Sequence, residues 1–308
     1  MRKQTVLFLL LIPLILISCN STTFTTVQAT IKDFVYAING AEISDILNTT
    51  FDLAIIDYSR DGTEDEKYTS AQIQSLKNND TIPIAYFSIG EAEDYRYYWQ
   101  DSWNSNPPSW LGEENPDWEG NYKVRYWQRG WKTIMFDYLD KILALGFEGV
   151  MLDIIDAYYY WSEEEGEVST QFAATEMIDF VCEIYTYAVS KTGNSHFKVF
   201  PQNAVEILDY DTTGKYLSHI TGLSIESLFY EDDKQTNSQD RGYRLEYLER
   251  YKDAGKLILV TDYIYPDMTQ INDFYSKTKA LGFIPYAADR STALDSVITI
   301  PNLQPSKN

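Results

Sequence analysis

Carboxylates follow short apolar runs at six places along this chain. Asp57 follows Leu53-Ala54-Ile55-Ile56, and Asp153 follows Gly149-Val150-Met151-Leu152. For a single aspartate in such a position, a role as a helix N-cap is as good an explanation as a catalytic role. Helix capping alone does not easily explain acids at six such positions. Clustered carboxylates repel one another, and this repulsion raises the pKa values of some of them. One carboxyl group can then keep its proton beside an ionised partner, as cleavage of a glycosidic bond requires. The acids in these positions are Asp57, Glu91, Glu93, Asp153, Asp156, Glu226, Asp262 and Asp289.

Aromatic and polar side chains accompany these acids. Aromatic faces bind the apolar faces of sugar rings, and amide or hydroxyl groups bind the sugar hydroxyls. At each tyrosine the alternative is that the ring only packs. The residues predicted on this basis to bind substrate, in addition to the acids, are Tyr36, Tyr58, Tyr86, Ser88, Tyr95, Trp127, Tyr159, Gln202, Asn203, Tyr230 and Tyr263.

Other chemistries have less support. The only histidines, His196 and His219, are both expected near strand beginnings, which leaves no His-rich zinc site and no Ser-His-Asp triad. Carboxylates such as Asp153 and Asp156 could hold Ca²⁺ or Mg²⁺, but no EF-hand spacing is present. We therefore expect neither a metal nor a cofactor, and a calcium-dependent surface protein is kept as an alternative.

The apolar runs predict the elements that position these groups. Between the runs lie segments with helical periodicity, so strands and helices alternate, as in a parallel α/β fold. Residues 31–301 are predicted to form one (β/α)8 TIM-type barrel, in which the C-terminal strand ends surround the active site. The expected strands are Phe34–Ile38, Leu53–Tyr58, Ile82–Ile89, Gly149–Ile155, Phe197–Pro201, Gly222–Leu228, Leu257–Tyr263 and Ile284–Ala288.

One long interval, Glu91 to Gly130, separates the third expected strand from the next helix. Loops of this length are usually functional or disordered, and a tryptophan-rich composition argues against disorder. We therefore predict a long Trp-rich insertion after the third strand. Its tryptophans are Trp99, Trp103, Trp110, Trp118 and Trp127.

The N-terminus resembles a bacterial lipoprotein signal. Arg2 and Lys3 precede an apolar segment that ends in Leu16-Ile17-Ser18-Cys19. We expect a signal peptide over residues 1–18, a lipidated Cys19 opening a tether over residues 19–30, and a short tail over residues 302–308. The protein would then be exported and anchored to the cell envelope. An ordinary signal peptide or an uncleaved anchor is the alternative.

Charge limits the choice of partners. With 46 acidic and 25 basic residues the formal net charge is −21, which would repel nucleic acid and favour a neutral or cationic ligand. The second cysteine, Cys182, is expected to be a small buried residue without a disulfide partner. We expect a monomer that binds a polysaccharide and no nucleic acid.

Four motifs resemble the glycoside hydrolase family 114-like barrels, which include endo-α-1,4-polygalactosaminidases and members once labelled cysteinyl-tRNA-synthetase-related. The resemblance covers nearly the whole chain after the tether. It implies that Asp153 and Glu226 are the catalytic pair, with Asp153 as nucleophile and Glu226 as acid/base, although Asp156 could replace Asp153. The motifs are Tyr86–Glu93, Gly149–Asp153, Pro201–Ala204 and Glu226–Tyr230.

The resemblance also implies a substrate of α-1,4-linked, partly deacetylated and therefore cationic galactosamine. The excess of carboxylates agrees, since it would attract ammonium groups. A surface lipoprotein that binds glycan without hydrolysing it is the alternative function.

Overall fold

The computed structural model describes residues 31–231 and 234–305. The predicted signal peptide, Cys19 and the tether therefore lie outside the described residues, as does the end of the predicted tail. Ile31–Asn308 is one compact unit. Within the described residues, no helix combines the length and apolar character needed to cross a membrane.

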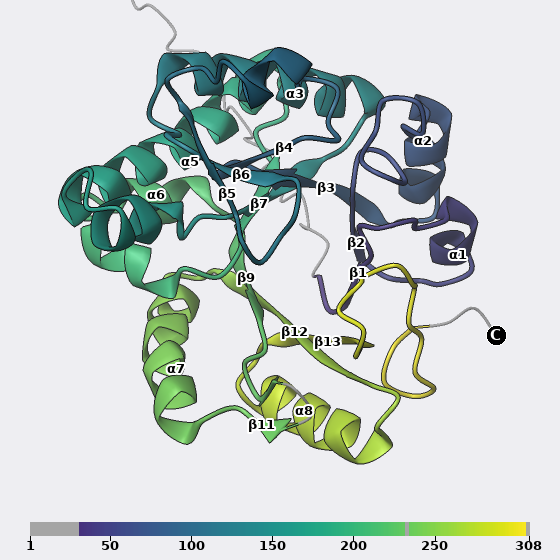
Figure 1. Cartoon of the computed structure of the whole chain (residues 1–308). Coiled ribbons are helices and arrows are strands. Elements are labelled where there is room, and N and C mark those ends of the chain that lie inside the picture. The colour runs from purple at the N-terminus through teal and green to yellow at the C-terminus, as the bar shows by residue number, and fades with distance from the viewer. Residues whose placement is uncertain (1–30, 232–233, 306–308) are drawn as a thin grey trace, which may run out of the picture. The chain divides into compact units, whose positions relative to one another are not determined.

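Eight parallel strands form the (β/α)8 barrel (Figure 1), and each of them overlaps one of the eight predicted apolar runs. Their order is β1-β2-β3-β7-β8 followed by β9-β12-β13. A bridge between Gln202 and Ser224 joins β8 to β9, and the rings of Phe34 in β1 and Tyr286 in β13 lie 5.5 Å apart. The strands are β1 (Phe34–Tyr36), β2 (Leu53–Ile56), β3 (Ile82–Ser88), β7 (Gly149–Asp153), β8 (Lys198–Pro201), β9 (Gly222–Glu226), β12 (Leu257–Tyr265) and β13 (Ile284–Asp289).

Amphipathic helices connect the strands and bury their apolar stripes against them. In α3 the apolar stripe of Met135, Tyr138 and Ile142 is buried, and the helix ends at Gly146, whose φ of 98° favours glycine. Residues 290–305, which follow the last strand, contain no helix. The connecting helices are α1 (Ile43–Leu47), α2 (Ser70–Asn78), α3 (Arg129–Leu145), α5 (Thr170–Thr192), α6 (Lys215–His219), α7 (Ser238–Asp253) and α8 (Met268–Ala280).

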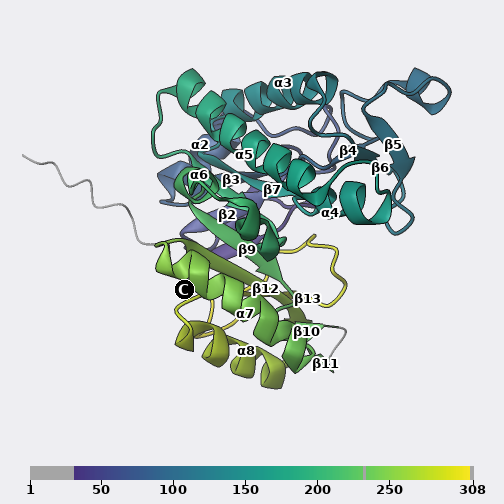
Figure 2. The ribbon, with the colours of Figure 1, turned by 90° about the vertical axis from the view of Figure 1, so that its left-hand side faces the viewer.

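The predicted insertion is an ordered subdomain. Its strands β4 (Glu91–Glu93), β5 (Leu111–Glu114) and β6 (Asn121–Val124) form an antiparallel sheet in the order β4-β6-β5, with a short 3-10 helix, η1 (Asp101–Asn104), before β5. In Figure 2 this sheet lies at the same end of the barrel as α4 (Ala157–Tyr159), β10 (Tyr230–Glu231) and β11 (Lys234–Gln235). The insertion therefore stands at the end where the parallel strands finish.

Tryptophans form the core of the insertion. The rings of Trp99 and Trp103 are 5.2 Å apart, those of Trp103 and Trp110 4.9 Å, and those of Trp110 and Trp131 5.1 Å. Trp118 is exposed. Most of the aromatic excess here is thus used for packing, which explains why so long a segment is ordered.

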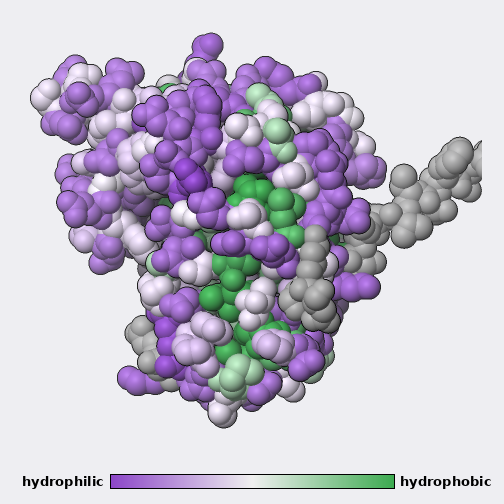
Figure 3. Space-filling model, turned by 90° about the vertical axis from the view of Figure 1, so that its right-hand side faces the viewer, coloured by the Kyte–Doolittle hydropathy of each residue, from purple (hydrophilic) through white to green (hydrophobic). Residues whose placement is uncertain are grey.

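One face of the molecule is mainly hydrophilic. Figure 3 shows a face on which hydrophilic residues predominate and hydrophobic residues gather in a central band.

Candidate active site

Asp153 is held at the C-terminal end of β7. Its Oδ2 accepts a hydrogen bond of 2.7 Å from the Tyr86 hydroxyl on β3, and its Oδ1 accepts one of 2.8 Å from the backbone N–H of Ile154. Two neighbouring strands of the barrel therefore fix this carboxyl group, because β3 pairs with β7.

Glu226 is held at the end of β9, two strands further along the barrel. Tyr263 on β12 donates its hydroxyl to Oε1, and Asn203 after β8 donates Nδ2 to Oε2 at 3.3 Å. Asn203 also accepts a bond of 3.1 Å from the Glu226 backbone N–H. The structure thus surrounds the two predicted catalytic acids with Tyr86, Asn203 and Tyr263, all three predicted site residues.

The two carboxyl groups interact electrostatically. Desolvation by burial, and then the charge of Glu226, raise the pKa of Asp153 from 3.8 to about 7. Burial likewise raises the pKa of Tyr36 well above its usual value, and the charges of Glu226 and Asp153 add to this effect. Tyr36, a further predicted site residue, is buried on β1 beside this pair.

Strained backbone follows the strands that carry the site. Ile154, Asn203 and Ser227 have φ values of 57°, 54° and 49°, in the left-handed region. This conformation costs about 1–3 kcal/mol for a residue other than glycine and is most unusual for a β-branched side chain. Such strain is concentrated at functional sites, and here it lies immediately after each of the two acids.

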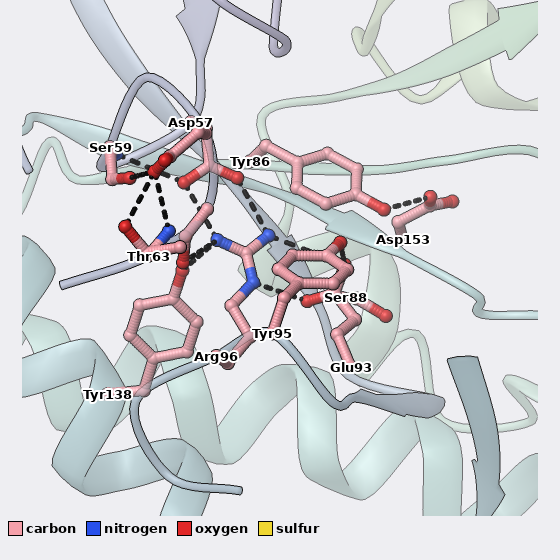
Figure 4. Close-up of polar contacts among 12 residues, drawn as sticks. Asp57, Ser59, Thr63, Tyr86, Ser88, Glu93, Tyr95, Arg96, Tyr138 and Asp153 are labelled. Carbon is pink, nitrogen blue, oxygen red and sulfur yellow. Dashed lines mark hydrogen bonds and ion pairs between the residues drawn. The ribbon is translucent and has the colours of Figure 1, made fainter. Parts of the chain in front are cut away.

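Asp57 and Glu93 were predicted to bind substrate, but the structure pairs both with Arg96 (Figure 4). The guanidinium donates to both oxygens of Asp57, at 2.9 and 2.7 Å, and to Oε2 of Glu93 at 2.6 Å. The Tyr95 hydroxyl donates to the other oxygen of Glu93 at 2.6 Å. Arg96 also donates to the Tyr138 hydroxyl at 2.9 Å. Our sequence interpretation missed Arg96, although an arginine three residues after Glu93 was an available signal.

Asp262, also predicted to bind substrate, has backbone partners in the structure. It is fully buried and accepts backbone hydrogen bonds from Leu228, Phe229 and Tyr230 at 2.9, 3.0 and 2.9 Å. These bonds fix the turn that follows Glu226. The role of this carboxylate is therefore to hold the strand end in place.

Asp262→Ala is expected to lower the free energy of unfolding by about 2–3 kcal/mol, because it leaves buried N–H groups without an acceptor. Urea denaturation followed by circular dichroism measures this change. Asp267→Ala is the matched control, since Asp267 accepts from two backbone N–H groups, of Thr269 and Gln270, at an exposed helix start. An equal loss in both variants would contradict the special role of the buried carboxylate.

Several other predicted substrate contacts have structural partners. Tyr58 is fully buried and donates to Glu64 at 3.1 Å, and Tyr230 donates to Asp273 at 2.5 Å. Trp127 packs edge-on against Trp161, with ring centroids 5.7 Å apart.

Glu91 is completely buried. It accepts from Lys123 at 2.6 Å and Asn115 at 2.8 Å, and its backbone oxygen accepts from the buried Ser88 hydroxyl at 3.3 Å. Asp289, at the end of β13, accepts from the backbone of Ser291 at 2.9 Å. Glu91 and Asp289, like Asp57, Glu93 and Asp262, thus have hydrogen-bond partners within the protein.

Two predicted residues, Asp156 and Tyr159, line a cavity of about 590 Å³ beside the pair. Gln202 is 2% exposed, at the point where β8 bridges to β9. Within the described ranges, no group of three or more His, Cys, Asp and Glu residues is arranged to hold a metal ion.

The chain matches a known family over almost its whole length. A model described as glycoside-hydrolase family GH114 matches residues 18–304. An uncharacterized protein of Methanocaldococcus jannaschii is 45% identical over 270 residues, covering 86% of this chain and 77% of that protein. An uncharacterized protein of Thermotoga maritima is 39% identical, covering 98% of this chain and 95% of that protein.

Solved structures share the fold at low sequence identity. The glycoside hydrolase domain of PelA from Pseudomonas aeruginosa superposes with a TM-score of 0.66 at 16% identity, over 86% of this chain and 95% of that one. Aspergillus fumigatus Ega3 in complex with galactosamine gives 0.59 at 17% identity, over 84% of this chain and 89% of that one. At these identities the likeness concerns the (β/α)8 fold.

Proposed function

The chain belongs to glycoside hydrolase family 114, and from that premise we propose that it hydrolyses internal bonds of an α-1,4-linked, galactosamine-containing polysaccharide. The observation that carries this proposal is the pair of Asp153 and Glu226, each held by a tyrosine hydroxyl from a neighbouring strand. The acidic composition of the chain supports a cationic amino-sugar polymer as substrate.

In the proposed reaction, Asp153 attacks the anomeric carbon while the glycosidic C–O bond breaks and Glu226 gives its proton to the leaving oxygen. Glu226 then takes a proton from water, the water oxygen bonds to the anomeric carbon, and the carboxylate of Asp153 is released. The hydroxyl of Tyr86 and that of Tyr263 hold the two carboxyl groups in place during both steps.

The test is incubation of the purified protein with partly deacetylated α-1,4-galactosaminan while new reducing ends are counted. Endo action predicts a rapid fall in polymer length from the first turnovers. Binding without new reducing ends would favour the non-hydrolytic lipoprotein, and inhibition by a chelator would favour the calcium-dependent alternative.

The pH profile tests the two roles. If Asp153 is the nucleophile it must be ionised, and kcat/KM then rises as pH increases through about 7, the pKa of this carboxyl group. Tyr86→Phe removes a hydrogen bond that lowers this pKa and should move the midpoint upward. Initial rates between pH 5 and 9 give both profiles. If kcat/KM instead falls through this midpoint, Asp153 is the proton donor and the roles are exchanged.

We also propose that the chain is exported and anchored through a lipidated Cys19, since Leu16-Ile17-Ser18-Cys19 has the form of a lipobox. In cells fed labelled palmitate, the wild-type protein should carry label and partition into detergent. Cys19→Ser should lose both properties. Retention of label in that variant would contradict the anchor.

A further inference from the structure

The strand end that carries Glu226 passes directly into a strained turn. Ser227 has a φ of 49°, in the left-handed region that residues other than glycine rarely adopt. Its backbone N–H donates to the carbonyl oxygen of Thr261 on β12 at 2.9 Å. The orientation of the two peptide groups that flank Ser227 then depends on what binds their carbonyl oxygens, which are those of Glu226 and Ser227.

Arg244 on α7 binds both of these carbonyl oxygens. The helix packs against β12, the strand next to the one that carries Glu226 (Figure 2). The guanidinium donates Nη1 to the oxygen of Glu226 at 3.0 Å and Nη2 to the oxygen of Ser227 at 2.6 Å. The hydroxyl of Thr236 also donates to the oxygen of Ser227, at 3.1 Å. Because a guanidinium presents its donors in one rigid plane, a single side chain here fixes two consecutive peptide groups.

Arg244 is itself held in place by its own helix. Its Nε pairs with Asp240, one turn earlier on α7, at 3.1 Å, and only 18% of the Arg244 side chain is exposed. The other partners of Glu226 act differently, since Tyr263 and the side-chain amide of Asn203 bind its carboxyl group. Arg244 acts on the backbone, and hence on the direction in which the Glu226 side chain leaves the strand.

We propose that Arg244 is a positioning residue for the proton donor. By holding the strained backbone after Glu226, it aims the carboxyl group at the glycosidic oxygen. This inference rests on the proposed function, in which Glu226 gives its proton to the leaving group. The aim of the donor matters because general acid catalysis needs hydrogen-bond geometry between the acid and the oxygen that it protonates.

The leaving group of the substrate separates positioning of the acid from general damage. Cleavage of the polymer releases a sugar alkoxide, which needs the proton, whereas a nitrophenyl group leaves as a weakly basic phenolate without one. Arg244→Met is expected to lower kcat/KM on partly deacetylated α-1,4-galactosaminan about 10²-fold, the effect of a small misplacement of a reacting group. On the nitrophenyl glycoside of an α-1,4-galactosamine oligomer, kcat/KM should change little, because it reports the bond-breaking step.

Arg241→Met is the matched control. Arg241 lies on the same helix and donates to one backbone oxygen, that of Thr236, at 2.8 Å, so its loss should leave kcat/KM on both substrates unchanged. Arg244→Lys keeps the charge and the apolar stem but cannot span two carbonyl oxygens. It should show the same selective loss at a smaller size, and it carries the test if the melting curve shows that Arg244→Met does not fold.

A readout without catalysis separates this inference from the proposed function. Amide hydrogen exchange, followed by mass spectrometry, should become faster over residues 226–230 in Arg244→Met and not in Arg241→Met, because the clamp holds this segment. Exchange that rises in neither variant, or equal losses of kcat/KM on both substrates, would overturn the role of Arg244. If the parent cleaves neither substrate while exchange rises only in Arg244→Met, the backbone clamp stands and the hydrolytic function fails.

Discussion

Asp153→Asn is expected to lower kcat/KM on the polysaccharide by ~10³-fold or more, and Glu226→Gln by a similar factor, because each removes one half of the catalytic pair. The amide introduced by Asp153→Asn would keep the size of the carboxyl group but could not attack the anomeric carbon. Counting of reducing ends under substrate-limiting conditions gives the ratio directly. Glu246→Gln, which changes an exposed carboxylate on α7, is the control and should leave kcat/KM unchanged.

Stability gives an independent readout of the same substitution. The pKa of Asp153 is raised from 3.8 to about 7 in the folded protein, so this group contributes most to the free energy of unfolding below pH 4, where it is protonated. That contribution is lost as pH rises through 7 and the buried carboxyl group ionises. Asp153→Asn should therefore melt above the parent at pH 8, with the difference narrowing toward pH 4. Normal activity in Asp153→Asn together with an inactive Asp156→Asn would transfer the catalytic role to Asp156.

The fold could be predicted because each strand carries its own signal. Gly149–Asp153 is a buried apolar run that ends in a polar residue, and Ile82–Ser88 has the same form. Because parallel strands bring such ends to one rim of the barrel, their placement could be predicted without knowing the side-chain contacts. The proposal of Asp153 and Glu226 as the catalytic pair rests on this placement together with the family motifs.

The partners of the other acids could not be predicted in this way. Asp57, Asp153 and Asp262 look alike in sequence, since each follows an apolar run. Their environments differ because Arg96 reaches Asp57 from 39 residues away, and the turn after Glu226 folds back onto Asp262. Aromatic composition is similarly ambiguous, because a tryptophan that packs in a small core has the same sequence signature as one that binds a sugar.

Arg96→Met is expected to lower the free energy of unfolding by about 3–5 kcal/mol, since it leaves Asp57 and Glu93 buried without their counter-charge. All three side chains are at most 5% exposed, so water cannot replace the guanidinium. Urea denaturation at pH 7 measures the change. Arg60→Met is the matched control, because Arg60 also pairs with two carboxylates, Glu42 and Glu66, but at the surface. Loss of that exposed pairing should cost far less, because water screens the charges.

Rescue distinguishes lost charge compensation from lost packing. Combining Arg96→Met with Asp57→Asn and Glu93→Gln removes the buried charges together and should recover much of the stability, as neutral replacements of buried ion pairs often do. The single variant should also recover as pH falls toward 4, because protonation then neutralises Asp57, whose pKa burial raises even beside the arginine. If the triple variant is no more stable than Arg96→Met, the guanidinium acts mainly by filling space and by its bond to Tyr138.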